Sequence, residues 1–528
     1  MKRGWLIVGA LALVACGDRA DKWDKRGQSA QTLGMSGSVA VLDAALDRML
    51  FVTSPEPYAL DVRAFGIGRN VAQVVSSPDR GRLFVLSKGV QPRRNPDDEF
   101  PSVSVFNAGT EPSFERRYEL TDPMQQLAVD PEQEWLVAFE GDSTVTNPNE
   151  FVLLPLDDDE TSGRSITIRS FGGVPQQVLF TDELTVPEGP ARRFLVVRTD
   201  RDIALIDLRQ LDREEVTVQT PVTRAGTQST PVEVVVDAGA PGTDEELPRF
   251  ARIAVRLAGE SDVMLLELGE PSEGSNKDFE VKFNIVNVGG VPSAIEFVNT
   301  DFGSRLAALV PDLRQAKLID PQTTIVESVD FPKAYSRLTR VTQDAGSGEL
   351  ALLYSPEIPG IAFWALGRAS GSLSKSVEQN EIDLSVAVVR DVPGERFAHL
   401  KILQGSNSAR FFVLDLVARQ TFPMLTEQQG FTVNVAPDGE RAWAFRPGGT
   451  EFASIDLSDL HPTSLSVSVP VSAIYDVERA DGSRAALTMH GTDAASRAGT
   501  LGVTLFDAQE PDSADTRFFG GLLLEGLL

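Results

Sequence analysis

The chain has 528 residues, of which 49 are Lys or Arg and 76 are Asp or Glu, so its formal net charge is −27. With 42% hydrophobic and 24% charged residues, the composition is that of a globular protein and argues against a disordered, collagenous or multi-span membrane chain. The acidic excess argues against a nucleic-acid partner, and one Cys with three His excludes a disulfide scaffold and disfavours a Cys/His metal cluster.

The first residues have the layout of an export signal. Lys2 and Arg3 form a short basic region, and an apolar run of ten residues follows at 5–14 (WLIVGALALV). This run is shorter than the about 20 residues that a permanent membrane-spanning helix requires. We therefore expect it to direct export rather than to form part of the fold.

The residues after this run, Leu13, Val14, Ala15 and Cys16, resemble the lipobox of bacterial lipoproteins. The resemblance implies that residues 1–15 are a signal peptide and that the Cys16 thiolate is the site of lipidation. It also implies an anchor in the cell envelope, and Gly17 in place of Asp favours the outer membrane, facing either the periplasm or the outside. The alternative is an ordinary secretory signal followed by an incidental cysteine.

Residues 16–37 are polar and mixed in charge and lack an apolar period, so we expect a lipidated Cys and a flexible tether. The body is then expected at 38–528. There, apolar runs of five or six residues alternate with turns that carry Pro, Asp and Gly, which predicts many short strands.

Three segments show the repeated unit most clearly: Ser76–Ser87 (SSPDRGRLFVLS), Val129–Glu140 (VDPEQEWLVAFE) and Val435–Arg446 (VAPDGERAWAFR). Each has a strand, then Pro and an acidic residue, then another strand, which is typical of a tight hairpin. First strands of such units are expected near Ser38, Val71, Gln126, Gln177, Val232, Ser293, Thr339, Ser385, Thr432 and Ala473.

Four antiparallel strands repeated about every 40–60 residues predict an all-β fold, a β-propeller of four-stranded blades. Radial stacking buries both faces of each small sheet and leaves only short edges. We expect a single ring near eight blades, within a range of seven to ten. The alternatives are two imperfect propellers or a pair of β-sandwiches.

The units resemble the YVTN-type repeats of surface-layer propellers, best at Val435–Phe445 and Val75–Val85. In that family an apolar residue and Pro-Asp-Gly precede one strand, and a later strand ends in Ile-Asp. The resemblance implies a propeller body of this kind, and the propeller class also includes lactonase-like hydrolases.

Few residues suggest a reaction or a metal. His399, His461 and His490 are expected to be ordinary strand-end or surface histidines rather than metal ligands, and no catalytic motif is present. The acidic run 157–160 has oxygen ligands suitable for Ca²⁺, but a solvated loop is the preferred interpretation. We therefore predict no catalytic residues, no metal site and no cofactor.

Polar insertions at Arg93–Phe100, Thr146–Glu150 and Thr243–Glu246 interrupt the repeat and are candidates for binding loops. We therefore expect a lipid-anchored, non-catalytic module that binds an envelope protein or a glycan. The alternative is a lactonase-like hydrolase that uses carboxylates and a divalent cation at the mouth of a propeller channel.

Overall fold

The computed structural model describes residues 29–141, 149–156, 163–167, 173–184, 191–212, 215–223, 226–238, 251–269, 280–300, 303–342, 349–366, 368–369, 372–373, 377–405, 410–425, 432–491, 501–508 and 516–521. In these residues the structure is all-β apart from one short 3₁₀ helix, η1 (Pro311–Leu313). Among them, no helix has the length and apolarity that a membrane-crossing segment requires.

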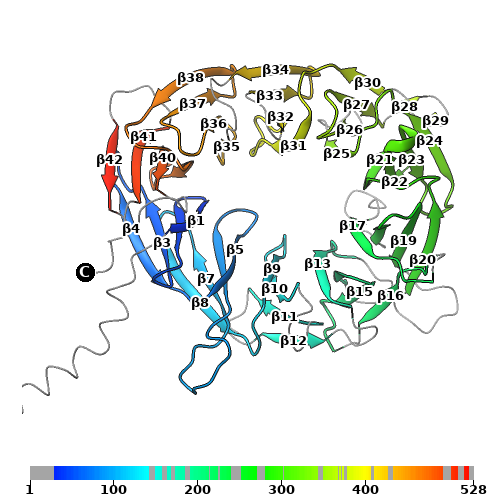
Figure 1. Ribbon diagram of the computed structural model, residues 1–528, viewed down its shortest axis with the longest axis horizontal. Coiled ribbons are helices and arrows are strands. Elements are labelled where there is room, and N and C mark those ends of the chain that lie inside the picture. The colour runs from blue at the N-terminus through cyan, green and yellow to red at the C-terminus, as the bar shows by residue number, and fades with distance from the viewer. Residues whose placement is uncertain are drawn as a thin grey trace, which may run out of the picture. The chain divides into compact units, whose positions relative to one another are not determined.

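The described strands form ten four-stranded antiparallel sheets and one two-stranded sheet (Figure 1). In each four-stranded sheet, strands that are neighbours in space are also neighbours in sequence, apart from a small hairpin inserted into one of them. This is the arrangement of propeller blades, without the crossing connections of a β-sandwich. The predicted all-β propeller is thus confirmed, with a blade count at the upper end of the expected range.

The chain divides into two compact units, which are described separately. The first comprises Met1–Val129, Leu154–Gly163 and Phe431–Leu528. Its strands are β1 (Ser29–Gly34), β2 (Val39–Asp43), β3 (Arg48–Thr53) and β4 (Asp61–Gly66); β5 (Val71–Ser76), β6 (Arg82–Ser87), β7 (Ser102–Asn107) and β8 (Ser113–Glu119); β9 (Gln126–Val129); β35 (Thr432–Val435), β36 (Arg441–Phe445), β37 (Glu451–Asp456) and β38 (His461–Ser466); and β39 (Ala473–Glu478), β40 (Arg484–His490), β41 (Gly502–Asp507) and β42 (Arg517–Gly520).

The second unit comprises Asp130–Leu153 and Arg164–Gly430. Its strands are β10 (Trp135–Phe139), β12 (Arg164–Thr167) and most of β11 (Glu150–Pro155); β13 (Pro175–Phe180), β14 (Phe194–Thr199), β15 (Asp202–Asp207) and β16 (Val216–Gln219); β17 (Pro231–Ala238), β18 (Ala251–Leu257), β19 (Asp262–Gly269) and β20 (Glu280–Asn287); β21 (Ala294–Thr300), β22 (Gly303–Val310), β23 (Gln315–Ile319) and β24 (Val326–Asp330); β25 (Arg337–Thr342), β26 (Glu349–Tyr354), β27 (Ile361–Ala365), β28 (Arg368–Ala369), β29 (Ser372–Leu373) and β30 (Val377–Asn380); and β31 (Val386–Asp391), β32 (Leu400–Gly405), β33 (Arg410–Asp415) and β34 (Gln420–Leu425).

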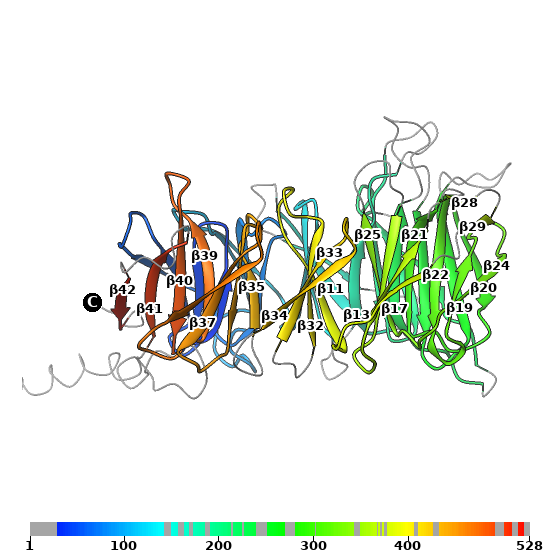
Figure 2. The ribbon, with the colours of Figure 1, turned by 90° about the horizontal axis from the view of Figure 1, so that it is seen from above.

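Burial differs between the strands of a blade, and this explains the apolar runs in the sequence. The second and third strands are mostly buried, and β2 and β3 are buried at every residue, because both faces of a blade are covered. The fourth strand is largely exposed, as in β20, where four successive residues face solvent. Figure 2 shows β39, β40, β41 and β42 of one blade side by side.

The three predicted hairpins share one backbone geometry. The residue after the acidic position has a positive φ in each: 58° at Arg80, 59° at Gln133 and 73° at Gly439. The amide of each donates to the carbonyl three residues earlier, on Ser77, Asp130 and Ala436 respectively, at 2.9 Å. The turn chemistry predicted from Pro and the acidic residue is therefore confirmed.

Nine of the ten expected unit starts lie within two residues of a first strand, from β5 at Val71 to β39 at Ala473. The first start is wrong, because Ser38 precedes a second strand. Residues 29–34, which we placed in the tether, form β1 and pair with β2, with Leu33 opposite Ala40. The segment SAQTLG has only one large apolar residue, so its strand is set by backbone pairing with β2.

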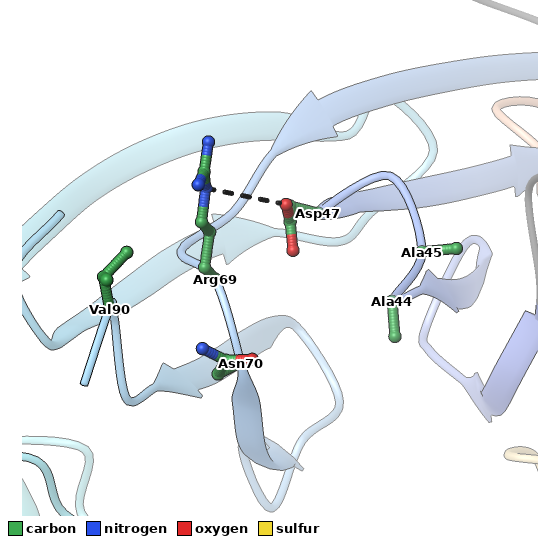
Figure 3. A pocket seen from close by; sticks show the side chains of 6 residues that line it. All are labelled: Ala44, Ala45, Asp47, Arg69, Asn70 and Val90. Atoms are coloured by element: carbon green, nitrogen blue, oxygen red, sulfur yellow. Dashed lines mark ion pairs between the residues drawn. The ribbon is translucent and has the colours of Figure 1, made fainter. Parts of the chain in front are cut away.

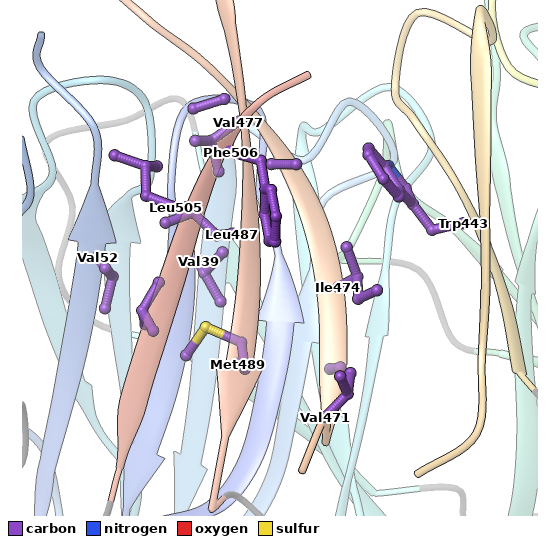
Figure 4. Packing of buried hydrophobic residues seen from close by; sticks show 14 of the residues in the cluster. Val39, Val52, Trp443, Val471, Ile474, Val477, Leu487, Met489, Leu505 and Phe506 are labelled. Carbon is purple, nitrogen blue, oxygen red and sulfur yellow. The ribbon is translucent and has the colours of Figure 1, made fainter. Parts of the chain in front are cut away.

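The first and last blades meet within the first unit through side chains rather than through a shared sheet. Their buried residues form one cluster with part of the β35–β38 blade, including Val39, Leu487, Phe506 and Trp443 (Figure 4). The Tyr475 hydroxyl on β39 lies 3.0 Å from Thr32 Oγ1 on β1. Segments 443 residues apart in the sequence are thereby joined.

Candidate binding recesses

In an antiparallel blade, the hairpin from the second to the third strand and the connection to the next blade lie at the same end. Two recesses occur at this end of their blades, one in each unit. We call them the first and the second recess.

The first recess has a volume of about 550 Å³. Ala44, Ala45 and Asp47 reach it from the β2–β3 hairpin, Arg69 and Asn70 from the β4–β5 connection, and Val90 from the β6–β7 loop. Figure 3 shows the Arg69 side chain between Asp47 and Val90. The recess thus brings together three loops from two adjacent blades.

Arg69 supplies the charge of the first recess. Its side chain is 60% exposed, and its Nε lies 3.9 Å from Asp47 Oδ2 and 3.8 Å from Glu99 Oε2. Exposed pairs at such distances are worth at most about 1 kcal/mol, so the guanidinium is only loosely held and remains open to solvent.

The β6–β7 loop contains the predicted insertion Arg93–Phe100 and is tied to this recess. The amides of Lys88 and Gly89 donate to the carbonyls of Asn70 and Arg69 at 3.0 Å. Asp98 accepts hydrogen bonds from the amides of Arg94 and Asn95 at 2.7 and 2.8 Å, which lower the pKa of its carboxyl. These bonds hold the loop in one conformation at the rim.

The second recess, of about 670 Å³, lies entirely within the second unit. Its lining residues come from 221–223 and 227–229 in the β16–β17 connection, 257–262 in the β18–β19 hairpin and 287–291 in the β20–β21 connection. The Asn287 side-chain amide donates to Asp262 Oδ1 at 2.6 Å and to Ser261 Oγ at 2.8 Å. The Asn287 Oδ1 accepts from the Gly289 amide at 3.0 Å, so this side chain fixes two of the three walls.

Sequence reasoning did not find the second recess. The segment Gly259–Asp262 has the composition of an ordinary hairpin turn, and nothing in it signals that Asn287 and residues 221–223 and 227–229 lie beside it. The insertions that we singled out lie elsewhere: of Thr146–Glu150 the structure describes only Asn149 and Glu150, and Thr243–Glu246 is outside the described residues.

The three histidines lie apart along the repeat. Both ring nitrogens of His490 have hydrogen-bond partners close to it. It is the last residue of β40 and is fully buried, with Nδ1 2.9 Å from the Pro470 carbonyl and Nε2 2.8 Å from Thr504 Oγ1. Burial lowers its pKa, which keeps the ring neutral. His399 lies in the turn before β32, and His461 is the first residue of β38.

The remaining predicted site residues lie outside the described residues. They are Leu13, Val14, Ala15 and Cys16, and the acidic run 157–160. Within the described part of the chain, no group of three or more His, Cys, Asp or Glu is arranged to hold a metal ion.

No protein-family model and no curated protein matches the chain in sequence. Among solved structures, dihydro-heme d1 dehydrogenase NirN in complex with DHE is 13% identical, with a TM-score of 0.37, over 82% of this chain and 78% of that one. Apo AztD from Citrobacter koseri is 9% identical, with a TM-score of 0.36, over 84% and 95%. Similarity at this level carries no argument about function, and the fold assignment rests on the blades themselves.

Proposed function

We propose that the protein is a lipid-anchored module of the bacterial cell envelope, attached through Cys16, whose propeller body binds a partner protein or glycan without catalysing a reaction. The observation that carries this proposal is the β6–β7 loop, which interrupts the repeat in sequence and is fixed at the rim of a recess. The outer membrane is the favoured location, as the Gly17 position implies.

A loop held in one conformation is suited to binding because little conformational entropy is lost when a partner docks. Arg69 adds an exposed guanidinium to the lining of the same recess. Arg93 lies over the Phe100 ring, 3.3 Å from its centroid, so the tip of the loop is also ordered by its own side chains.

The test is a pull-down of the full-length protein from gently solubilised envelopes, with R69Q and C16A variants. Lys282 is an exposed cation on the outer strand β20, so K282Q is the matched control for charge. We expect a stoichiometric partner with the wild type and K282Q, a weaker yield with R69Q, and loss of the partner with C16A. Recovery of no partner by the wild type, or turnover of a defined substrate by the purified protein, would contradict the proposal.

A further inference from the structure

The outer strand of the β17–β20 blade presents apolar side chains to solvent. Figure 1 shows β20 beside β19, on the opposite side of the blade from β17. On β20, Val281, Phe283 and Ile285 share one face, because side chains alternate along a strand. We call these three residues the apolar row. Phe283 is 59% exposed and Ile285 is 46% exposed, whereas Val281 is half-buried.

The apolar row continues a buried core. The register with β19 pairs Val281 with Leu268, Phe283 with Leu266 and Ile285 with Met264. These three β19 residues are buried in the cluster between this blade and the β13–β16 blade. Directly opposite residues of an antiparallel pair lie on the same face of the sheet. The apolar row is therefore the place where this core reaches the edge of the sheet and meets solvent.

The edge of β20 lacks the features that protect other outer strands. Natural edge strands are kept short, charged or interrupted by Pro. Five of the other described outer strands have only four or five residues, and β8 has Glu115, Arg116 and Arg117 in succession. The outer strands β34 and β38 contain Pro423 and Pro462. In contrast, β20 has eight residues and no Pro, and among the described strands it pairs with β19 alone.

The apolar row is self-complementary. Val281 and Ile285 lie two residues before and two residues after Phe283. If two copies of β20 pair antiparallel about a two-fold axis through Phe283, this ring faces its own copy, and each Val281 faces the Ile285 of the other copy. Aromatic and β-branched cross-strand pairs of this kind stabilise antiparallel pairing. A shift by one residue would place Phe283 against the polar Asn284, so the apolar row selects this register.

We infer that two copies of the protein associate through β20, which joins their β17–β20 blades into one continuous antiparallel sheet. The interface is of the kind in which the same surface of both copies is used, and the added strand supplies main-chain hydrogen bonds. On the other face of β20, Lys282 lies opposite Glu267 of its own β19, so the interface does not bury an isolated cation. This inference goes beyond the proposed function and depends on neither the lipid anchor nor the first recess.

The charge of the chain gives the association a salt dependence. Each copy has a formal net charge of −27, so two copies repel one another. Salt screens this repulsion, because the Debye length falls from about 30 Å at 0.01 M to about 8 Å at 0.15 M ionic strength. We expect the dimer fraction to rise over this range, as is typical of an apolar contact between acidic molecules.

Disulfide cross-linking of the full-length chain tests the register. All proteins carry C16A, so the introduced cysteine is the only thiol and no lipid holds two copies in one micelle. Opposite Cα atoms are about 4.5–5.5 Å apart in an antiparallel pair, which a disulfide can span. We therefore expect F283C to form a linked dimer by itself, and V281C to link to I285C when the two are mixed. Alone, V281C and I285C should stay monomeric, because their own copies lie about 13 Å apart along the strands. E327C, at an exposed position of β24, is the control and should not link.

Sedimentation at increasing protein concentration and ionic strength tests the association without a cross-link. F283K places two cations against each other at the axis, and we expect its dimer Kd to rise more than about tenfold. V417K is the matched control, because Val417 is an exposed apolar residue outside β20, and its dimer Kd should not change. Equal melting temperatures of F283K and the parent would show that the fold is intact. A parent protein that stays monomeric at the highest concentration and ionic strength, an undiminished dimer in F283K, or linkage of V281C alone as strong as in the mixture would overturn the inference.

Discussion

At the scale of single residues, a buried carboxyl group between the last two blades has a strongly shifted pKa. Asp476 on β39 accepts a hydrogen bond from Trp443 Nε1 on β36 at 3.0 Å. Burial, and after it the charge of Asp438, raises the pKa of Asp476 to about 7, although Arg484, Arg441 and the Trp443 bond oppose the shift. The folded state of the chain therefore favours the neutral form of Asp476.

This shift makes stability depend on pH. The unfolded carboxyl ionises near pH 4, so the folded chain retains a proton that the unfolded chain has lost between about pH 4 and 7. The stabilisation is complete below that window and is lost as the pH rises through it, by up to about 4 kcal/mol for three pKa units. In D476N, which keeps an acceptor for Trp443, we expect this part of the pH dependence to vanish and stability above pH 7 to exceed that of the wild type.

Urea unfolding of the wild type and D476N at pH 5, 6, 7 and 8, followed by tryptophan fluorescence, measures this difference. E451Q is the control, because Glu451 is an exposed carboxylate on β37, the strand that pairs with β36. The wild type and E451Q should weaken together as the pH rises. An equally steep loss in D476N would show that Asp476 is not the group responsible.

At the scale of elements, one buried ion pair joins two turns that each precede the second strand of a blade, and both of its residues lie in the second unit. Arg193, just before β14, donates to both oxygens of Asp130 in the turn before β10, with Nη1 2.7 Å from Oδ2. The side chains are 2% and 0% exposed. Burial alone would lower the pKa of Arg193, but the hydrogen bonds and charges of Asp130 and its acidic neighbours raise it. The turn that contains Asp130 was predictable from its Pro-Glu sequence. The pairing of Asp130 with Arg193, 63 residues later, was not.

Removal of one member of this pair leaves a buried charge uncompensated. We expect R193M to lose about 3–5 kcal/mol of unfolding free energy. The D130N/R193M double variant should lose less than the sum of the two single variants, because it leaves neither fully buried member of the pair charged without its partner. In contrast, R419M removes an exposed pair with Glu378, whose side chains are 36% and 54% exposed, and should cost less than about 1 kcal/mol. Additive losses from chemical denaturation would show that the two residues do not act together.

The contact between the first and last blades depends on a glycine. A Cβ placed on Gly34, at the end of β1, would lie 2.6 Å from Tyr475 Cδ1, whereas a Cβ on Gly66, at the end of β4, would meet nothing within 4 Å. We expect G34A to displace Tyr475 and to cost about 1–3 kcal/mol, as overpacking does. G66A is the matched control and should leave the melting temperature nearly unchanged. Equal melting temperatures for G34A and the wild type would mean that the ring moves aside freely.

At the scale of the whole molecule, the features predictable from the sequence are the local ones. Strand starts and hairpins follow from short apolar runs and from Pro with an acidic residue, and they identified the blades. The recesses did not follow, because each joins three separate loops through residues such as Asn287 and Arg69 that have no motif of their own. β1 was missed for the same reason, since its pairing with β2 outweighs its polar sequence.

At the same scale, the proposed membrane anchor depends on the sulfur of Cys16, the one cysteine in the sequence. If Cys16 is lipidated and residues 1–15 are removed, growth with an alkyne fatty acid should label the wild type, and the protein should sediment with outer-membrane vesicles. Because the body is strongly acidic, it has little attraction for an anionic membrane surface without the lipid. C16S should therefore lose the label and move to the soluble fraction, whereas G17S, which keeps the cysteine, should retain both. Labelling of C16S, or membrane association of C16S that high salt does not release, would contradict the lipobox assignment.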